Sequence, residues 1–383
     1  MRIYRGQCME KVFPSMGCTT FYNTGDMACS SPEGVTKGLV CDADIYGVKT
    51  PAKYLRTFFE GCSHSHEIVD AVTKIYEING SYAGAFNHEG EVYIFRDVLG
   101  VKPLYYQGET FASERKVLLN PLPLLPGELR KLPSTRLFRK QLHQVITQDP
   151  QQILDALTKN VHQVTEKDAA VLFSGGIDSS ILAALSDAPL FTCGLEGSQD
   201  ILFSRKAARL LKKEYIELVI SEKDVREAIP RVLSIIEDKT LMNLELGLLI
   251  YFVCKTGDKK ILISGQGADE LFGGYYKYEK AFNQKKDVKA LMRKDLDTIC
   301  YGLERDGQVA ERFSTLIRYP YLDPCVVQRG LGIPVHSLFT PQRKGFLRKV
   351  ASLLFLPDEI VSRPKKALQY GSGIHKIVKK IIC

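Results

Sequence analysis

Two short stretches of this sequence combine glycine, serine and carboxylate residues at a spacing suited to binding a phosphorylated ligand. Residues 174–180 read SGGIDSS, and residues 264–270 read SGQGADE. Glycines let the backbone turn sharply and approach a ligand closely, while serine hydroxyls and the exposed amides of a helix start donate hydrogen bonds to an anion. The first stretch lacks the lysine of the GxxxxGKS/T nucleotide loop, so it predicts a different mode of phosphate binding.

Each stretch follows an apolar run that is typical of a buried strand. Residues 169–173 precede the first stretch and a helical pattern over 181–185 follows its serines, while residues 261–263 precede the second stretch. Further apolar runs at 189–195 and 214–220 alternate with helical patterns, which favours a parallel sheet with helices on both faces. Ligands of such sheets bind at the carboxyl ends of the strands, where these loops would lie.

The two stretches resemble the motifs of the asparagine synthetase branch of the ATP pyrophosphatases. SGGIDSS is similar to the PP-loop of that family, and SGQGADELFGGY is similar to its pattern SGxGxDExFGGY. RKGFLRKV matches a KxxLR pattern through Lys344, Leu347 and Arg348, and LPDEIVSRPKKAL is similar to LPxEIxxRPKxGF. The resemblance implies an α/β protein with a C-terminal parallel-sheet PP-loop domain of the adenine nucleotide α-hydrolase-like type.

The same resemblance implies ATP and Mg²⁺ as ligands and assigns residues to them. Asp178 and Asp269 are the expected metal ligands, since a hard cation prefers carboxylate oxygens. Lys344 is the cation expected to neutralise phosphate charge in the transition state, so Lys344, Asp178 and Asp269 are the candidate catalytic residues. The expected ATP and pyrophosphate ligands are Ser174, Gly175, Gly176, Asp178, Ser179, Ser180, Gly265, Gln266 and Lys344.

The first third of the chain follows another pattern. Residues 81–87 and 91–95 flank a turn at residues 88–90, which predicts a β-hairpin. RDVLGVKPLYY at 96–106 and FASERKVLL at 111–119 then resemble the glutaminase domain of asparagine synthetase-type amidotransferases. This resemblance implies a glutaminase-like (Ntn-type) α+β sandwich of two antiparallel sheets flanked by helices.

Composition predicts where the two domains meet. Residues 120–134 (NPLPLLPGELRKLPS) are rich in proline, which a helix interior or a central strand does not tolerate. We expect a joint in this segment that ends the core of the first domain. The predicted domains are a glutaminase-like domain over residues 1–140 and an asparagine synthetase-like ATP pyrophosphatase domain over residues 141–383.

The glutaminase-like domain departs from its family where chemistry is expected. Enzymes of that family use a Cys that becomes N-terminal after removal of the first Met, but position 2 here is Arg2. Cys8 and Cys18 would serve only after proteolytic trimming. DADIYG at 42–47 matches the family's NGEIYN loosely and puts Asp42 where an oxyanion-stabilising Asn belongs, the wrong charge for that role. We therefore predict a folded but inactive glutaminase.

One residue of the second motif bears on which group acts as the general base for the incoming amine. In the family, the residue between the glycines of SGxG is often a carboxylate proposed to deprotonate the incoming amine, and here it is Gln266. An amide cannot act as a base. The identity of the base is therefore left open, and neutral ammonia would not need one.

The function implied is an AMP-forming amide synthetase. It would adenylate a carboxylate, in the simplest case aspartate, and transfer the acyl group to ammonia without glutaminase activity of its own. Three alternatives stay open: a relative of β-lactam synthetases and lasso-peptide cyclases that uses an amine of its substrate, a synthetase fed with ammonia by a separate glutaminase, and a non-enzymatic ATP-binding regulatory protein.

Composition limits the other classes. The chain has a formal net charge of +8, ten Cys and no CxxC pair, and it lacks an apolar run of about 18 residues that could span a membrane. We expect a cytoplasmic protein with no membrane partner and no nucleic acid partner. Whether it forms a homodimer is left open.

Overall fold

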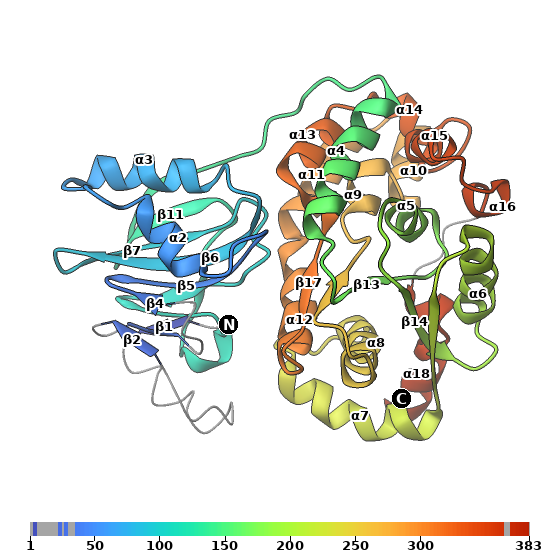
Figure 1. Ribbon diagram of the computed structural model, residues 1–383, viewed down its shortest axis with the longest axis horizontal. Coiled ribbons are helices and arrows are strands. Elements are labelled where there is room, and N and C mark those ends of the chain that lie inside the picture. The colour runs from blue at the N-terminus through green and yellow to red at the C-terminus, as the bar shows by residue number, and fades with distance from the viewer. Residues whose placement is uncertain (1–2, 6–21, 25–26, 30–34, 364–367, 383) are drawn as a thin grey trace. The chain divides into compact units, whose positions relative to one another are not determined.

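The computed structural model describes residues 3–5, 22–24, 27–29, 35–363 and 368–382. Arg2, Cys8 and Cys18, on which the prediction of an inactive glutaminase partly rests, lie outside these residues. The chain divides into two compact units, Met1–Leu142 and His143–Cys383 (Figure 1). Among the described residues, no helix combines the length and the hydropathy needed to cross a bilayer.

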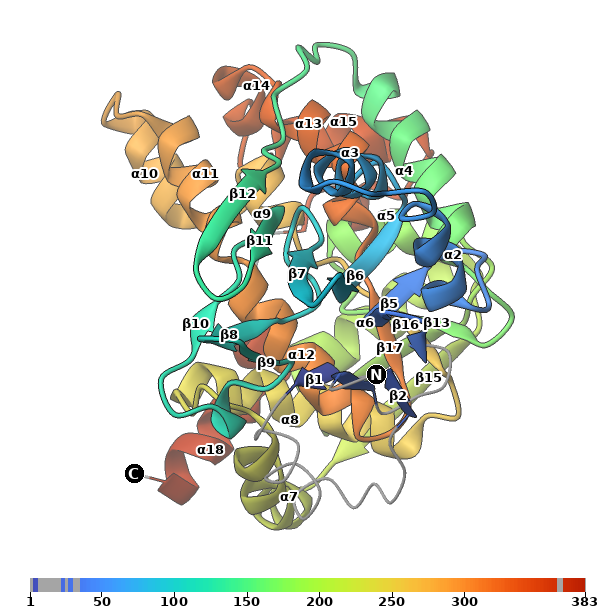
Figure 2. The same ribbon diagram turned by 90° about the vertical axis from the view of Figure 1, so that its left-hand side faces the viewer.

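The first unit contains two six-stranded antiparallel sheets, with two helices covering one of them (Figure 2). The sheet under the helices has the order β12-β11-β7-β6-β5-β4, and the other has the order β10-β8-β9-β1-β3-β2. The strands are β1 (Ile3–Arg5), β2 (Tyr22–Thr24), β3 (Met27–Cys29), β4 (Val35–Thr36), β5 (Leu39–Ile45), β6 (Gly80–His88), β7 (Glu91–Arg96), β8 (Tyr105–Gln107), β9 (Thr110–Ala112), β10 (Leu122–Pro123), β11 (Glu128–Lys131) and β12 (Thr135–Arg139). The helices are α2 (Pro51–Thr57), α3 (Ser65–Ile75) and the 3-10 helix η2 (Arg115–Val117).

Strand β5 is buried along its whole length because both faces of its sheet are covered. Leu39 on one face belongs to a core that includes Leu55 and Ile68 from the two helices. Val40 points to the opposite face and joins a second core with Phe111 of the other sheet, as the two-residue period of a strand requires. The predicted pair of antiparallel sheets is confirmed, and among the described residues the helices α2 and α3 cover one of the two sheets.

The proline-rich segment 120–134 is not a simple joint, and that prediction was wrong. It contains strand β11, which lies inside its sheet between β7 and β12. Pro126 and Pro133 fall just outside β11, and Pro123 falls in β10, the last strand in the order of its sheet. Proline therefore removes no donor from an interior strand, and the first unit continues through β12.

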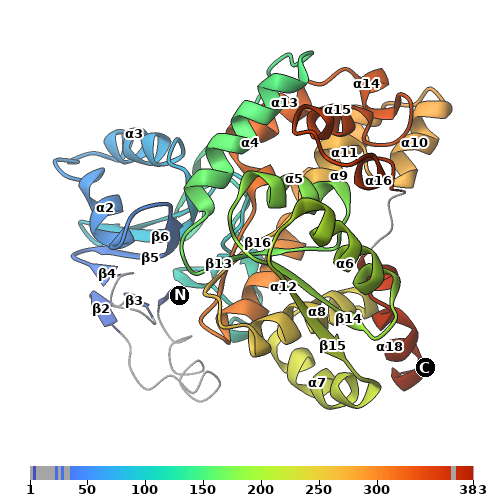
Figure 3. The ribbon, with the colours of Figure 1, turned by 45° about the vertical axis from the view of Figure 1, so that its right-hand side comes forward.

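The second unit is organised around a five-stranded parallel sheet in the order β15-β14-β13-β16-β17. Helices α6 and α8 pack against strand β14 from opposite faces, as predicted (Figures 1 and 3). The strands are β13 (Ala169–Leu172), β14 (Leu190–Leu195), β15 (Tyr215–Ile220), β16 (Ile261–Ile263) and β17 (Leu316–Arg318). The helices are α4 (Pro150–Val164), α5 (Ile177–Leu185), α6 (Gln199–Leu211), α7 (Glu222–Ile235), α8 (Leu241–Thr256), α9 (Ala268–Phe272), α10 (Tyr276–Asn283), α11 (Val288–Thr298), α12 (Cys300–Glu311), η3 (Pro320–Leu322), α13 (Pro324–Leu331), α14 (Val335–Phe339), α15 (Gly345–Leu353), α16 (Asp358–Val361), α17 (Leu368–Gly371) and α18 (Ile374–Ile382).

Helix α5 begins four residues before the helical pattern that the sequence indicated. Its N-cap is Gly176, so Asp178, Ser179 and Ser180 lie in the first turn and not in the loop. The apolar pattern becomes visible only at residue 181, because the first turn is polar. A carboxylate in a first turn is stabilised by the partial positive charge of the helix N-terminus.

Candidate active site

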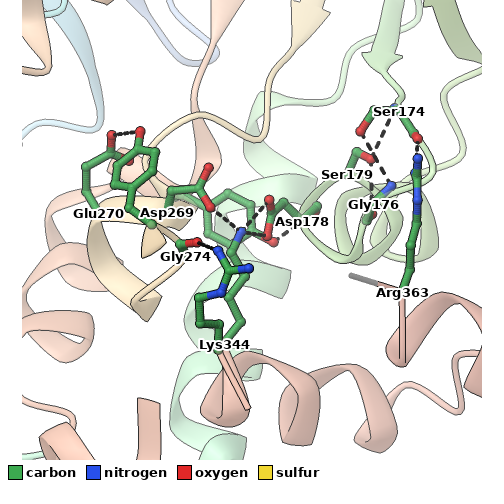
Figure 4. A network of polar contacts seen from close by, with 12 residues as sticks. Ser174, Gly176, Asp178, Ser179, Asp269, Glu270, Gly274, Lys344 and Arg363 are labelled. Carbon is green, nitrogen blue, oxygen red and sulfur yellow. Dashed lines mark hydrogen bonds and ion pairs between the residues drawn. The ribbon is translucent and has the colours of Figure 1, made fainter. Parts of the chain in front are cut away.

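The loop between β13 and α5 closes on itself through its serine side chains. The Ser179 hydroxyl accepts a hydrogen bond from the Ser174 amide (3.3 Å) and donates to the Gly176 carbonyl (3.2 Å) (Figure 4). Gly175 has a φ of +69°, and a Cβ there would lie 2.8 Å from Cδ1 of Phe203 on α6. Glycine is therefore required at this position both by the backbone conformation and by packing.

The loop after β16 brings a second carboxylate to the first loop. Strands β13 and β16 are adjacent and parallel, so their carboxyl ends lie side by side. A Cβ on Gly265 would lie 3.3 Å from the Cβ of Asp178, which shows how closely the loops approach. Gly267, with a φ of +96°, is the N-cap of α9, and Asp269 lies in the first turn of that helix.

Lys344 connects the two carboxylates. Its Nζ lies 2.5 and 2.6 Å from the two carboxylate oxygens of Asp178 and 2.6 Å from Oδ1 of Asp269 (Figure 4). The Lys344 side chain is 1% exposed, whereas those of Asp178 and Asp269 are 14% and 16% exposed. Lys344 itself precedes α15 in a left-handed conformation, with a φ of +61°. The fold thus brings together the three residues that the sequence nominated as catalytic.

Gly274 leaves the space that this cluster occupies. A Cβ at this position would lie 1.8 Å from Oδ1 of Asp269 and 2.5 Å from Cε of Lys344. The Gly274 carbonyl also accepts a hydrogen bond from Arg343 (3.1 Å), and Arg343 pairs with Glu279 (3.3 Å). Glycine is therefore required at position 274 so that Asp269 and Lys344 can pack together.

Two neighbouring groups are biased toward their protonated forms. Burial, and then the charge of Asp269, raises the pKa of the Glu270 carboxyl, which accepts a hydrogen bond from Tyr275 (2.7 Å). Burial, and then the charges of Asp178 and Asp269, raises the pKa of Tyr321 well above its usual value. The Tyr321 hydroxyl donates to the backbone carbonyl of Asp178 (2.9 Å), so it stabilises the first turn of α5.

The sequence analysis gave no role to two arginines beside these loops. Arg363 donates to the Ser174 carbonyl (2.6 Å) and to Oδ1 of Asp200 (3.0 Å), and its guanidinium carbon lies 4.0 Å from the centre of the Phe203 ring. Arg348 donates to the backbone carbonyls of Arg343 and Arg363. Both arginines lie in the motif segments RKGFLRKV and SRPKK, so the motif positions were the available signal.

Two further residues that were predicted to bind ATP are Ser180 and Gln266. The Ser180 hydroxyl is buried, and its oxygen has no hydrogen-bond partner among the described residues. The backbone N–H of Gln266 faces the Ser264 hydroxyl (3.3 Å), and its Nε2 would lie 2.9 Å from a Cβ placed on Gly302 of α12. Residues 364–367 of the RPKK segment lie outside the described residues.

The two carboxylates suit a Mg²⁺ ion that substrate phosphates help to bind. Mg²⁺ is usually held by one or two protein carboxylates, with phosphate oxygens and waters in the other positions. In the part of the chain that the structure describes, no group of three or more His, Cys, Asp or Glu side chains could hold a metal. The unpartnered Ser180 hydroxyl offers a further hydrogen-bond donor to a phosphate oxygen. The donor set therefore fits a metal that arrives with a nucleotide.

The first unit has a buried ion pair at the position where an oxyanion-stabilising Asn was expected. Lys102 lies 2.9 Å from Oδ1 of Asp42, and the two side chains are 10% and 2% exposed. Lys102 belongs to the RDVLGVKPLYY segment, so two motifs of the first domain meet in this contact. The Asp42 carboxylate is thus neutralised by a lysine of its own domain.

A parallel sheet with a serine–glycine loop and a carboxylate-bearing loop after adjacent strands defines the second unit as an α/β domain of the kind that binds ligands at its carboxyl edge. The model of the asparagine synthase family matches residues 152–316 and 279–381, which together span 152–381 of the 383 residues. The chain therefore belongs to the asparagine synthase family.

The chain is also similar to individual proteins. The chain is 29% identical to a putative asparagine synthetase (glutamine-hydrolyzing) of Methanocaldococcus jannaschii, over 91% of this chain and 80% of that protein. It is 27% identical to asparagine synthetase B of Escherichia coli over 78% of this chain and 62% of that protein, and 28% identical to the human asparagine synthetase over 54% and 40%. An NMN synthetase structure from Francisella tularensis is 12% identical with a TM-score of 0.30, over 58% of this chain and 75% of that chain.

Proposed function

We propose that this protein is an AMP-forming amide synthetase that activates a carboxylate with ATP and transfers it to ammonia. The observation that carries the proposal is the cluster in which one buried lysine bridges Asp178 and Asp269 at the ends of adjacent parallel strands. Aspartate is the simplest carboxylate substrate, and asparagine would then be the product. The relatives' names favour this choice.

The first step is adenylation. The substrate carboxylate oxygen attacks the α-phosphorus of ATP, the bond to the bridging oxygen breaks, and pyrophosphate leaves. The first-turn amides of α5 and the Ser180 hydroxyl would hold phosphate oxygens, and Lys344 would stabilise the negative charge that builds up as pyrophosphate departs. Bound Mg²⁺, held by Asp178 and Asp269, would supply additional charge neutralisation for the phosphates.

The second step forms the amide. Ammonia attacks the acyl carbon, AMP leaves with the electron pair of the broken C–O bond, and the nitrogen loses a proton. Gln266 cannot take that proton, because the side-chain amide of glutamine is not a base. We propose that ammonia enters in its neutral form and that solvent or released AMP accepts the proton after attack.

The test is exchange of labelled pyrophosphate into ATP, screened over aspartate and other amino acids, followed by AMP release with ammonia or glutamine. We expect aspartate-dependent exchange and turnover with ammonia alone. Binding of ATP·Mg²⁺ without exchange for any free amino acid would redirect the proposal to a specialised or cyclising substrate. Absence of ATP·Mg²⁺ binding would exclude both the synthetase and the ATP-binding regulatory protein, and would favour a scaffold protein derived from the enzyme.

We further propose that the first unit is a glutaminase-like domain without glutaminase activity. The Asp42–Lys102 pair supports this, because it puts a neutralised carboxylate where a neutral donor is needed to stabilise an oxyanion. Nitrogen would then come from free ammonia, from a separate glutaminase, or, as in β-lactam synthetases and lasso cyclases, from the substrate itself. Glutamine-dependent turnover by the purified chain would contradict the proposal, and glutamine dependence only in cell extract would point to the separate glutaminase.

A further inference from the structure

Arg348 on α15 is a buried cation whose side chain is held by the backbone. It is 8% exposed. Its Nε donates to the Arg343 carbonyl (3.0 Å), and its Nη2 donates to the Arg363 carbonyl (3.2 Å). The remaining nitrogen, Nη1, is buried and has no hydrogen-bond partner among the described residues. The guanidinium is therefore fixed in orientation with one nitrogen unused.

Arg348 differs from the other described cations of this site because it has no acidic partner. Lys344 is held by Asp178 and Asp269, and the two further guanidinium groups pair with carboxylates, Arg343 with Glu279 and Arg363 with Asp200. The two groups that Arg348 contacts are neutral carbonyls. A buried charge is costly unless a counter-charge accompanies it. An anion at Nη1 would supply the counter-charge that Arg348 lacks among the described residues.

The electrostatic surroundings agree with a missing anion. Burial lowers the pKa of Arg348, the nearby Asp178 carboxylate opposes this effect, and the neighbouring Arg343 lowers the pKa further. Helix α15 packs against α5 and α9, the two helices whose first turns carry Asp178 and Asp269. Arg348 follows Lys344 by one helical turn, since its backbone N–H donates to the Lys344 carbonyl (2.9 Å), and it therefore lies beside the lysine–carboxylate cluster.

We infer that Arg348 binds the polyphosphate chain of ATP, with Nη1 donating a charge-assisted hydrogen bond to a phosphate oxygen. This inference rests on the proposed function, since it assumes that the cluster binds ATP. The two backbone carbonyls hold the planar guanidinium so that its third nitrogen is free for the ligand. A lysine has a single ammonium on a flexible chain and cannot make this arrangement, so Lys is not a conservative replacement here.

The experiment measures binding of ATP·Mg²⁺ and of adenosine to the full chain by calorimetry, for the wild type, R348M and R348K. We expect R348M to bind ATP·Mg²⁺ about tenfold to a hundredfold more weakly, from the size of a lost charged hydrogen bond, with adenosine affinity unchanged. R348K should lie between the wild type and R348M. R231M is the matched control, because Arg231 contacts Tyr251 on the exposed side of α7 and should leave both affinities unchanged.

The outcomes separate this inference from the proposed function. Wild-type protein that does not bind ATP·Mg²⁺ overturns both. Wild-type binding with an unchanged R348M overturns only the role of Arg348. An equal loss of ATP and adenosine affinity also overturns it, because that result indicates a structural role through the Arg343 and Arg363 carbonyls. If R348M does not fold, the same comparison of ATP with adenosine in R348K decides the question.

Discussion

The two units of this protein each bury a lysine against a carboxylate, and the two arrangements differ in which partner solvent can reach. In the first unit, Asp42 is 2% exposed and Lys102 is 10% exposed, and the pair joins one acid to one base. In the second unit, Lys344 is 1% exposed, whereas its two partners, Asp178 and Asp269, are 14% and 16% exposed. Both side chains of the first pair are enclosed, whereas in the second unit the lysine is enclosed and its two partners are partly exposed.

This difference separates a structural pair from a candidate binding site. The Asp42–Lys102 pair joins opposite charges that are both largely enclosed, so it offers little to a ligand. The two carboxylates around Lys344 are more exposed than the lysine, so they keep edges open to solvent. Such exposed carboxylate oxygens suit an incoming cation, and the nitrogen of Arg348 that has no partner among the described residues suits the anion that would accompany it.

Breaking the pair in the first unit should have the largest effect, and that effect should be on stability. We expect Lys102→Met to lower the free energy of unfolding of this unit by about 3–5 kcal/mol, because it leaves the Asp42 carboxylate buried and unpaired. Urea unfolding measures the loss. The double variant Asp42→Leu with Lys102→Met should restore most of the stability, since neither charge is then buried. Pyrophosphate exchange per folded molecule should stay at the wild-type rate, and its loss in a stable variant would make the pair functional.

Breaking the cluster in the second unit should chiefly affect activity. We expect Lys344→Met to reduce pyrophosphate–ATP exchange by about 10²–10³-fold, the usual cost of removing one group that stabilises transition-state charge. Lys223 on α7 is the matched control, because it is exposed and its pair with Glu227 is 3.9 Å long. Exchange by Lys344→Met at the same rate as Lys223→Met would show that Lys344 is a structural residue like Lys102.

Adding one methyl group at Gly274 tests how tightly the lysine–carboxylate cluster packs. Gly274→Ala would push a Cβ into Oδ1 of Asp269, so Asp269 or Lys344 must move. Displacement of a catalytic group by about 1 Å can cost on the order of 10²-fold in rate, and we expect an exchange defect of up to that size. Gly307→Ala is the control, because a Cβ at Gly307 on α12 would meet nothing within 4 Å. Equal exchange rates in the two variants would contradict the packing role of Gly274.

The smallest expected effect is a pH dependence in the first unit. Burial raises the pKa of Asp97 above its usual value, although it accepts hydrogen bonds from the amides of Lys102, Val101 and Tyr82. A carboxyl with a raised folded-state pKa contributes stability that is fully present below its unfolded pKa of about 3.9 and is lost as pH rises through the folded value. Urea midpoints of the wild type and of Asp97→Asn, compared from pH 4 to 7, should differ in slope with this sign. A wild-type slope that is less negative than that of the variant would refute it.

Local patterns were sufficient for much of the fold. The apolar runs at 189–195, 214–220 and 261–263 contain strands β14, β15 and β16, and the hairpin is formed by β6 and β7 around Glu89 and Gly90, both with positive φ. Prediction failed where a local rule was applied to a whole segment. The prolines of residues 120–134 led to the prediction that this segment contains no central strand, yet β11 lies between Pro126 and Pro133. The predicted start of helix α5, at residue 181, is four residues too late, because the first turn of the helix is polar and shows no apolar pattern.

Residue type and motif spacing are local properties, and they were sufficient to nominate Asp178, Asp269 and Lys344 as candidate catalytic residues. How these three side chains meet depends on the tertiary fold. The ammonium of Lys344 lies between carboxylates that are distant in the chain, and Gly274 leaves room for it. The fold also pairs Asp42 with Lys102 and leaves one nitrogen of Arg348 without a partner among the described residues. Charge pairing and burial depend on which segments pack together, and packing is set by the whole fold.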